Sequence, residues 1–187
     1  TVAGHEEVPL PEEGPVHPVH DFLRARQLVD LARSRLEVEV GRAFRRGSGA
    51  WLVVDGSLAQ SPHWASDSRM LGISKSHATL PFEGEELEQY LRLSPGHRSP
   101  VFAPPGNEVA PVYAWALRLW PWEGKDLLHG FIRVEAAAVM ETVSAADQVS
   151  RWLLAERAPV STPDPRWDRL LYGIHAVEQY LRASGER

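Results

Sequence analysis

The feature that most constrains this sequence is a short apolar run that ends abruptly at an aspartate. Residues 51–54 read Trp-Leu-Val-Val and are followed by Asp55, Gly56 and Ser57. A continuous apolar run of this length, stopped by Asp-Gly, is typical of a strand buried inside a sheet. We therefore expect a central strand, with the Asp55 carboxylate at its carboxyl end, where α/β sheets place ligands and metals. The alternative is a plain turn, since Asp-Gly is also a common turn pair.

The segment before this strand has the pattern of an amphipathic helix. Asp21 is a candidate N-cap and Gly47 a candidate C-terminal stop, which predicts a helix over residues 21–46. Glu39 falls inside the apolar stripe, and a buried glutamate needs a cation or a hydrogen-bond donor. Glu37 lies beside the stripe and by itself is typical of a solvated position. The stripe consists of Ala25, Leu28, Ala32, Leu36, Val40 and Ala43.

These acidic residues suggest a metal site if the helix packs on the strand. Glu37 or Glu39 would then share a divalent cation with Asp55. An oxygen-rich site of this kind suits magnesium or manganese, which assist phosphodiester hydrolysis. The chain contains no cysteine, so any metal must be held by carboxylates, histidines and water. The alternative is that each glutamate pairs with an arginine of the same helix.

The rest of the chain is predicted to form strands and helices around one sheet. A Pro- and Gly-rich loop separates the early strands from a two-stranded hairpin with period-two alternation. Ser144 followed by Asp147 is a capping-box pattern that opens a helix. We expect a mixed α/β sheet flanked by helices. The expected elements are a strand within residues 69–80, a loop over 95–111, strands over 112–120 and 128–139, and helices over 144–157 and 164–183.

Composition favours one globular domain behind a short tail. The 187 residues are 43% hydrophobic, enough for one sizeable core. Residues 1–20 are rich in proline and glutamate and are expected to be an extended tail, with residues 21–187 as the domain. We see no apolar run long enough to span a bilayer and no secretory signal, so we expect a soluble cytoplasmic protein. The net charge of −5 argues against a protein that coats nucleic acid, but not against an enzyme that acts on it.

Two basic residues on predicted strands are candidates for contact with a phosphate. Lys75 ends the sequence Gly-Ile-Ser-Lys and would stabilise charge on a scissile phosphate. The alternative is a surface lysine on an edge strand. Arg133 shares a strand face with Glu135 and Phe131, so it forms an ion pair across that face or follows a phosphate backbone.

The last helix offers further candidates. If it begins near Gly173, its inner stripe contains Ile174, Val177 and Leu181, and Glu178 falls on the same stripe. Glu178 is therefore the best late candidate for a metal ligand. His175 is a second candidate, although a lone histidine at a helix edge is more often a packing residue.

Taken together, the motifs resemble the NurA family, RNase H-like nucleases that process DNA ends. Their order and spacing over residues 30–180 carry the resemblance. The matching motifs are Arg35-Leu36-Glu37, Val54-Asp55-Gly56-Ser57, Gly72-Ile73-Ser74-Lys75, Ile132-Arg133-Val134-Glu135 and Leu171-Tyr172.

The resemblance implies a manganese- or magnesium-dependent deoxyribonuclease. Asp55 and one of Glu37 and Glu39 would be metal ligands, Lys75 an active-site cation, and Tyr172 a residue near the catalytic centre. It also implies a homodimer that works on DNA with a hexameric HerA-type translocase. The family has an earlier strand that ends in a metal-binding aspartate, and no such apolar strand precedes residue 21. The chain is accordingly expected to be the later, C-terminal portion of an RNase H-like domain.

Two other functions remain open at this stage. The first is a non-catalytic adaptor of a DNA-processing complex, because the neighbouring Trp115, Trp120 and Trp122 could support an interface or base stacking. The second is a metal-dependent transferase or phosphatase built on a similar sheet.

Overall fold

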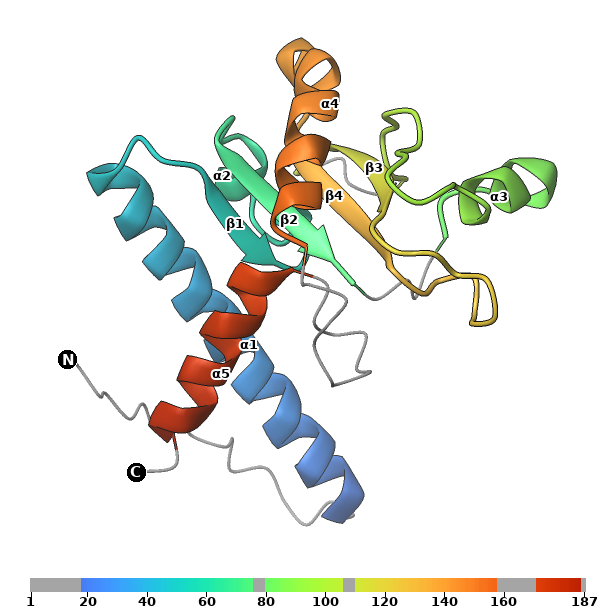
Figure 1. Cartoon of the computed structure of the whole chain (residues 1–187). Coiled ribbons are helices and arrows are strands. Elements are labelled where there is room, and N and C mark those ends of the chain that lie inside the picture. The colour runs from blue at the N-terminus through green and yellow to red at the C-terminus, as the bar shows by residue number, and fades with distance from the viewer. Residues whose placement is uncertain (1–17, 76–79, 106–109, 158–170, 186–187) are drawn as a thin grey trace. The chain divides into compact units, whose positions relative to one another are not determined.

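A computed structural model describes residues 18–75, 80–105, 110–157 and 171–185 (Figure 1). The chain divides into two compact units, Thr1–Ala50 and Trp51–Arg187. The first contributes a single described helix. The second contains a four-stranded mixed sheet and the remaining helices, as expected for an α/β protein. The predicted boundary at residue 20 stays a prediction.

Helix α1 of the first unit spans Pro18–Gly47 and confirms the predicted long helix. It begins before Asp21, which lies in the first turn rather than at the N-cap. The predicted stripe is only partly covered, because Leu36 and Val40 are exposed. Glu39 is exposed as well, so the first unit by itself does not bury this glutamate as expected.

The sheet of the second unit has the strand order β1-β2-β4-β3. β1 runs parallel to β2, whereas β4 is antiparallel to both β2 and β3. In the described part of the chain, β1 therefore has a partner on one side only. Val53 of β1 is 40% exposed, so the prediction of a buried central strand is wrong. The strands are β1 (Leu52–Asp55), β2 (Met70–Ser74), β3 (Val112–Arg118) and β4 (Phe131–Ala137).

Helix α4 (Met140–Ala155) covers one face of the sheet (Figure 1). Its Val149 and Leu153 pack on Trp115 and Ile132 in the main core. Trp115 is fully buried and donates a hydrogen bond from Nε1 to Ser150 Oγ at 3.0 Å, so this tryptophan is a core residue.

The predicted start of this helix at Ser144 is wrong. The helix begins at Met140, with Val139 in the N-cap position. Ser144 lies inside the helix and donates from Oγ to the carbonyl of Glu141. Its hydroxyl bonds back to the preceding turn instead of capping, as serine can do within a helix.

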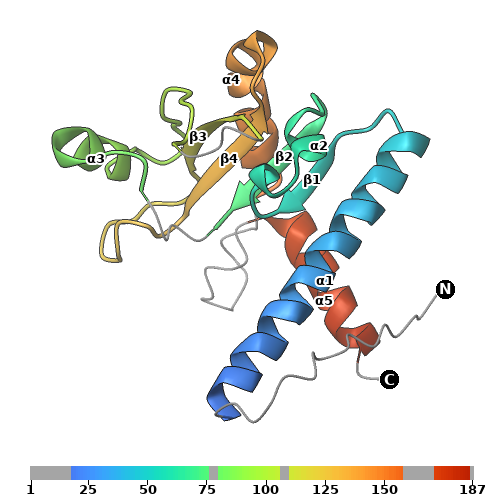
Figure 2. The ribbon, with the colours of Figure 1, turned by 180° about the vertical axis from the view of Figure 1, so that it is seen from behind.

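The opposite face of the sheet is covered by short helices that the sequence did not predict. A 3-10 helix, η1 (Leu58–Gln60), and α2 (Pro62–Ala65) lie between β1 and β2 in the chain and pack near β2 and β4 (Figure 2). Helix α3 (Gly84–Leu91) contributes Tyr90 to a second apolar cluster with Phe131. Such short elements carry too few apolar repeats to show periodicity in the sequence.

The last helix, α5, spans Tyr172–Gly185 and confirms that a helix ends the chain. Residues 158–170, where the predicted helix began, lie outside the described residues. Ile174 packs against the main core, but Val177 and Leu181 are exposed, so the predicted inner stripe is largely wrong. No described helix is long and apolar enough to cross a membrane.

A buried arginine at the end of β3 holds two loops together. Arg118 is fully buried and donates hydrogen bonds to the carbonyls of Leu91, Leu93, Leu127 and His129. Its guanidinium also lies 4.6 Å from the ring centre of Phe131. Burial lowers the pKa of Arg118 to about 10, although the negative charges of Glu123 and Asp126 act to raise it. This single side chain therefore ties the segment after α3 to the loop between β3 and β4.

Replacing this arginine should destabilise the second unit strongly. Arg118→Met leaves four carbonyls without their donor, and we expect the free energy of unfolding to fall by about 3 kcal/mol or more. Denaturant unfolding measures the change. Arg151→Met removes an exposed arginine of α4 and should change stability by less than about 0.5 kcal/mol. Equal effects of the two substitutions would contradict this role of Arg118.

Candidate functional site

Three charged side chains meet at the carboxyl ends of the parallel strands. Lys75 Nζ lies 3.1 Å from Asp55 Oδ2 and 3.1 Å from Glu178 Oε1. Asp55 ends β1 and Lys75 directly follows β2, so the parallel pairing brings them to one edge of the sheet. Glu178 comes from α5, more than 100 residues further along the chain. The group thus joins two strands and a helix.

Lys75 is the central member of this group. Its side chain is only 15% exposed, compared with 44% for Asp55 and 26% for Glu178. Burial lowers the pKa of Lys75, but the hydrogen bonds and negative charges of Glu178 and Asp55 outweigh it and raise the pKa above 10.5. The lysine therefore stays protonated at neutral pH and partly neutralises both carboxylates. It is not the exposed edge-strand lysine that was the sequence-based alternative.

A second polar cluster lies on the other face of the sheet. Along β4, Ile132 and Val134 face the core beneath α4, so Arg133 and Glu135 face the opposite side. Glu135 is 1% exposed, and its Oε2 accepts hydrogen bonds from Ser57 Oγ at 2.6 Å and from the backbone N–H of Leu58 at 2.9 Å.

The other oxygen of Glu135 faces an arginine. Its Oε1 lies 3.1 Å from Arg133 Nε, which confirms the ion pair predicted for this strand face. Arg133 Nε nevertheless has no hydrogen-bond partner, so the contact is electrostatic and lacks hydrogen-bond geometry. The carboxylate thus joins β4 to the turn that follows β1.

Gly72 allows that turn to approach the sheet. A Cβ atom at this position would lie 2.7 Å from the carbonyl oxygen of Gly56 and 3.0 Å from the backbone N of Leu58. Only glycine leaves room for this backbone to cross β2 and reach Glu135. The glycine of the Gly-Ile-Ser-Lys motif is therefore explained by packing.

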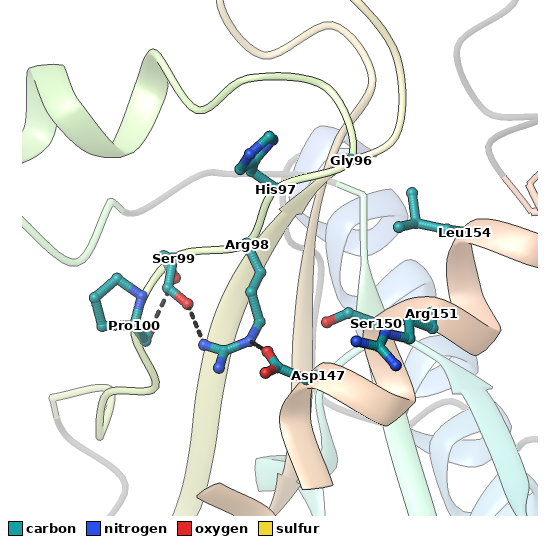
Figure 3. A pocket seen from close by; sticks show the side chains of 9 residues that line it. All are labelled: Gly96, His97, Arg98, Ser99, Pro100, Asp147, Ser150, Arg151 and Leu154. Atoms are coloured by element: carbon teal, nitrogen blue, oxygen red, sulfur yellow. Dashed lines mark hydrogen bonds and ion pairs between the residues drawn. The ribbon is translucent and has the colours of Figure 1, made fainter. Parts of the chain in front are cut away.

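A third polar region lies between α4 and the loop before β3 (Figure 3). Arg98 points from the loop to Asp147 of α4, with Nε 2.6 Å from Oδ1, and it also donates to the carbonyl of Ser99. Arg151 lies further along the same helix. The pocket is open to solvent, and two opposite charges in it, Arg98 and Asp147, already pair with each other. This region therefore attaches the loop before β3 to α4.

The residues predicted for the site have different positions in the structure. Asp55, Lys75 and Glu178 come together. Arg133 faces the other side of the sheet, paired with Glu135. His175 is half-buried in the first half of α5. The side chain of Tyr172, the first residue of α5, lies outside what the structure describes.

The two helix glutamates belong to the other unit. Glu37 lies within α1 and its Oε1 is 3.6 Å from Arg33 Nε, an ion pair within that helix. Glu39 lies two residues further along α1. Whether either carboxylate approaches Asp55 stays a prediction, because α1 and the sheet form separate compact units. Among the described residues, no three acidic or histidine side chains form a ready metal cluster.

Sequence reasoning overlooked several residues of these clusters. The sequence marks Ser57 only as part of the Asp-Gly-Ser turn, and no local pattern singles out Tyr90. The spacing of Ser57 from Glu135 is 78 residues, so no local pattern links them. The one available signal is Glu135 itself, a carboxylate in a largely apolar strand that must find buried donors.

Comparisons with protein families and with characterised proteins find no match for this chain.

The close approach at Gly72 leads to a stability prediction. Gly72→Ala forces the Gly56–Leu58 backbone away from β2, and we expect the free energy of unfolding to fall by about 1–3 kcal/mol. Gly47→Ala is the control, because a Cβ at Gly47 meets nothing within 4 Å. Denaturant unfolding of both variants is the measurement, and an unaffected Gly72→Ala protein would contradict the packing argument.

The raised pKa of Lys75 leads to a pH prediction. Because the pKa of Lys75 is raised in the folded state, its full contribution to the free energy of unfolding is present below pH 10.5. That contribution is lost as the pH rises through the folded-state pKa. Lys75→Met should therefore flatten the fall in unfolding free energy as the pH rises above 10.5. Lys125→Met removes an exposed lysine and should leave the slope unchanged. The same slope in the Lys75→Met and unsubstituted proteins would contradict the assignment.

Proposed function

We propose that this protein is a divalent-metal-dependent nuclease that hydrolyses DNA phosphodiester bonds. The observation that carries the proposal is the contact of Lys75 with both Asp55 and Glu178 at the carboxyl ends of the parallel strands. This is the edge at which open α/β sheets bind ligands. The same proposal includes the fold family: the chain would be the later portion of an RNase H-like domain. A mixed sheet flanked by helices is compatible with it.

The side chains present suit a hard divalent cation. Magnesium commonly binds proteins through one or two carboxylates and retains several waters, and Asp55 and Glu178 supply two carboxylates. Both are partly exposed, so water and substrate oxygens can complete the coordination. The bound manganese or magnesium ion would supply Lewis-acid stabilisation of the phosphate and activation of water.

The protein residues have separate roles in this proposal. Asp55 and Glu178 hold the ion, with Glu37 or Glu39 of α1 as a further ligand. Lys75 keeps the two carboxylates in place in the free protein and donates to a phosphate oxygen in the complex. Its fixed positive charge then stabilises the negative charge that develops on the phosphate.

The remaining assignments come from the sequence alone. Tyr172 and His175, at the start of α5, are proposed to contact the substrate near the cleaved bond. The proposed assembly is a homodimer that acts on DNA with a HerA-type translocase. These partners rest on the motif resemblance.

Cleavage assays test the proposed activity. We expect the protein to cut labelled DNA with manganese and to stop when the metal is chelated. Asp55→Asn keeps the shape of the side chain but removes its charge, and should lower the cleavage rate by about 100-fold or more. Lys75→Gln should lower it by roughly 100-fold as well. Glu86→Gln removes an exposed acid of α3 and should leave the rate unchanged.

The alternative function is a non-catalytic adaptor of a DNA-processing complex. One observation favours it: Lys75 already pairs with the two carboxylates that a metal would need. Calorimetry with manganese distinguishes the two functions, because the nuclease must take up the ion through Asp55. Cleavage that persists in Asp55→Asn, or an absence of manganese binding, would end the nuclease proposal.

A further inference from the structure

A small cavity of about 170 Å³ opens beside Arg133 on the sheet face opposite α4. Its polar wall consists of Ser57, Arg133 and Glu135, and its apolar wall includes Leu80 and Phe102. It therefore combines apolar side chains with a few polar and charged groups, as small-ligand sites do. Asp55, Lys75 and Glu178 do not contribute to it.

The carboxylate in this cavity is already occupied. Glu135 accepts from Ser57 and Leu58 through one oxygen and faces Arg133 Nε through the other. A cationic ligand would have to displace these partners. The cavity is thus poorly suited to a metal ion or an amine.

Arg133, in contrast, has unused donors. Its side chain is 19% exposed, its Nε has no hydrogen-bond partner, and its terminal nitrogens donate to no described residue. A guanidinium carries five N–H donors in a planar fork that matches the oxygens of a carboxylate or phosphate. A ligand that accepts from the terminal nitrogens would form charge-assisted hydrogen bonds, which Arg133 does not make with any described residue.

A second donor near the arginine also lacks a partner. Tyr90 is 4% exposed and its hydroxyl makes no hydrogen bond. Burial raises the pKa of Tyr90 to about 12, while the charge of Arg133 acts in the opposite direction. The hydroxyl therefore stays protonated and lies within the field of the guanidinium. The ring of Tyr90 also packs at 6.2 Å from that of Phe102, in the cavity wall.

We propose that this cavity binds the phosphate or carboxylate group of a small ligand, with the Arg133 guanidinium as its main hydrogen-bond donor. An oxyanion offers only acceptors, and Arg133, which lines the cavity, offers donors. Tyr90 packs on Phe102 of the cavity wall without lining the cavity itself. Glu135 orients the arginine through Nε and leaves the terminal nitrogens to the ligand. The inference is independent of the proposed nuclease activity, because none of the residues proposed to hold the metal lines this cavity.

Binding can be measured without metal. The unmodified protein, in the presence of a chelator, is titrated by NMR or calorimetry with inorganic phosphate, acetate, thymidine monophosphate and thymidine. We expect saturable binding of at least one oxyanion and none of thymidine. Binding of inorganic phosphate or acetate indicates a free anion as the ligand. Binding of the nucleotide alone indicates that the phosphate belongs to a larger molecule.

Matched variants locate the binding site. Arg133→Lys keeps the charge beside Glu135 but loses the planar fork, and should weaken binding by roughly tenfold. Leu80→Trp fills the rim from a partly exposed position, without touching Arg133, and should abolish binding. Lys125→Met, which removes an exposed charge elsewhere, should leave the affinity unchanged.

Two results would overturn the proposal. One is the absence of binding for all three oxyanions. The other is unchanged affinity in both Arg133→Lys and Leu80→Trp, with folding of each variant verified by its thermal transition. Asp55→Asn separates this site from the nuclease proposal. Its affinity for the oxyanion should equal that of the unmodified protein. An increase would assign the anion to the Lys75 region instead, because this substitution removes one of the two carboxylates that pair with Lys75.

Discussion

The buried carboxylate of Glu135 organises the sheet of this protein. A glutamate that is 1% exposed must find donors, and it obtains them from the turn after β1 and from Arg133 on its own strand. Because Ser57 and Leu58 follow Asp55 by only a few residues, the same hydrogen bonds hold the end of β1 against β2 and β4. The position of Asp55 thus depends on a strand about 80 residues away.

Charge is arranged differently on the two sides of this sheet. On the side of α4, Lys75 lies between Asp55 and Glu178, a partly exposed group with one positive and two negative charges. On the other side, one oxygen of Glu135 accepts two hydrogen bonds and the other faces Arg133, whose guanidinium has no hydrogen-bond partner on that strand face. The first group therefore suits a cation and a phosphate together, whereas the second suits an oxyanion alone. Similar residue types support different chemistry because their hydrogen-bond partners differ.

Local patterns predicted much of the fold. Each of four elements has a pattern that appears within a few neighbouring residues: the alternating apolar residues of β3 and of β4, the apolar run of β1 that stops at Asp55, and the helical repeat of apolar residues in α1. All four elements are present in the structure. The predictions failed where distant contacts decide. Val53 looked like a central strand residue, but β1 has no described neighbour on its second side. Ser144 looked like an N-cap, but the helix that packs on the sheet begins earlier, at Met140.

The sequence by itself determined the types of elements and the candidate residues, because hydrophobic period and turn chemistry act over short stretches of chain. It identified Asp55, Lys75 and Glu178 separately and found the pairing of Arg133 with Glu135, two residues apart on one strand. Only the tertiary structure decided that Lys75 meets both carboxylates, that Ser57 bonds to Glu135, and that Arg133 and Tyr90 keep unused donors. Such contacts join segments far apart in the chain, and they depend on strand order and on which side of the sheet each helix covers.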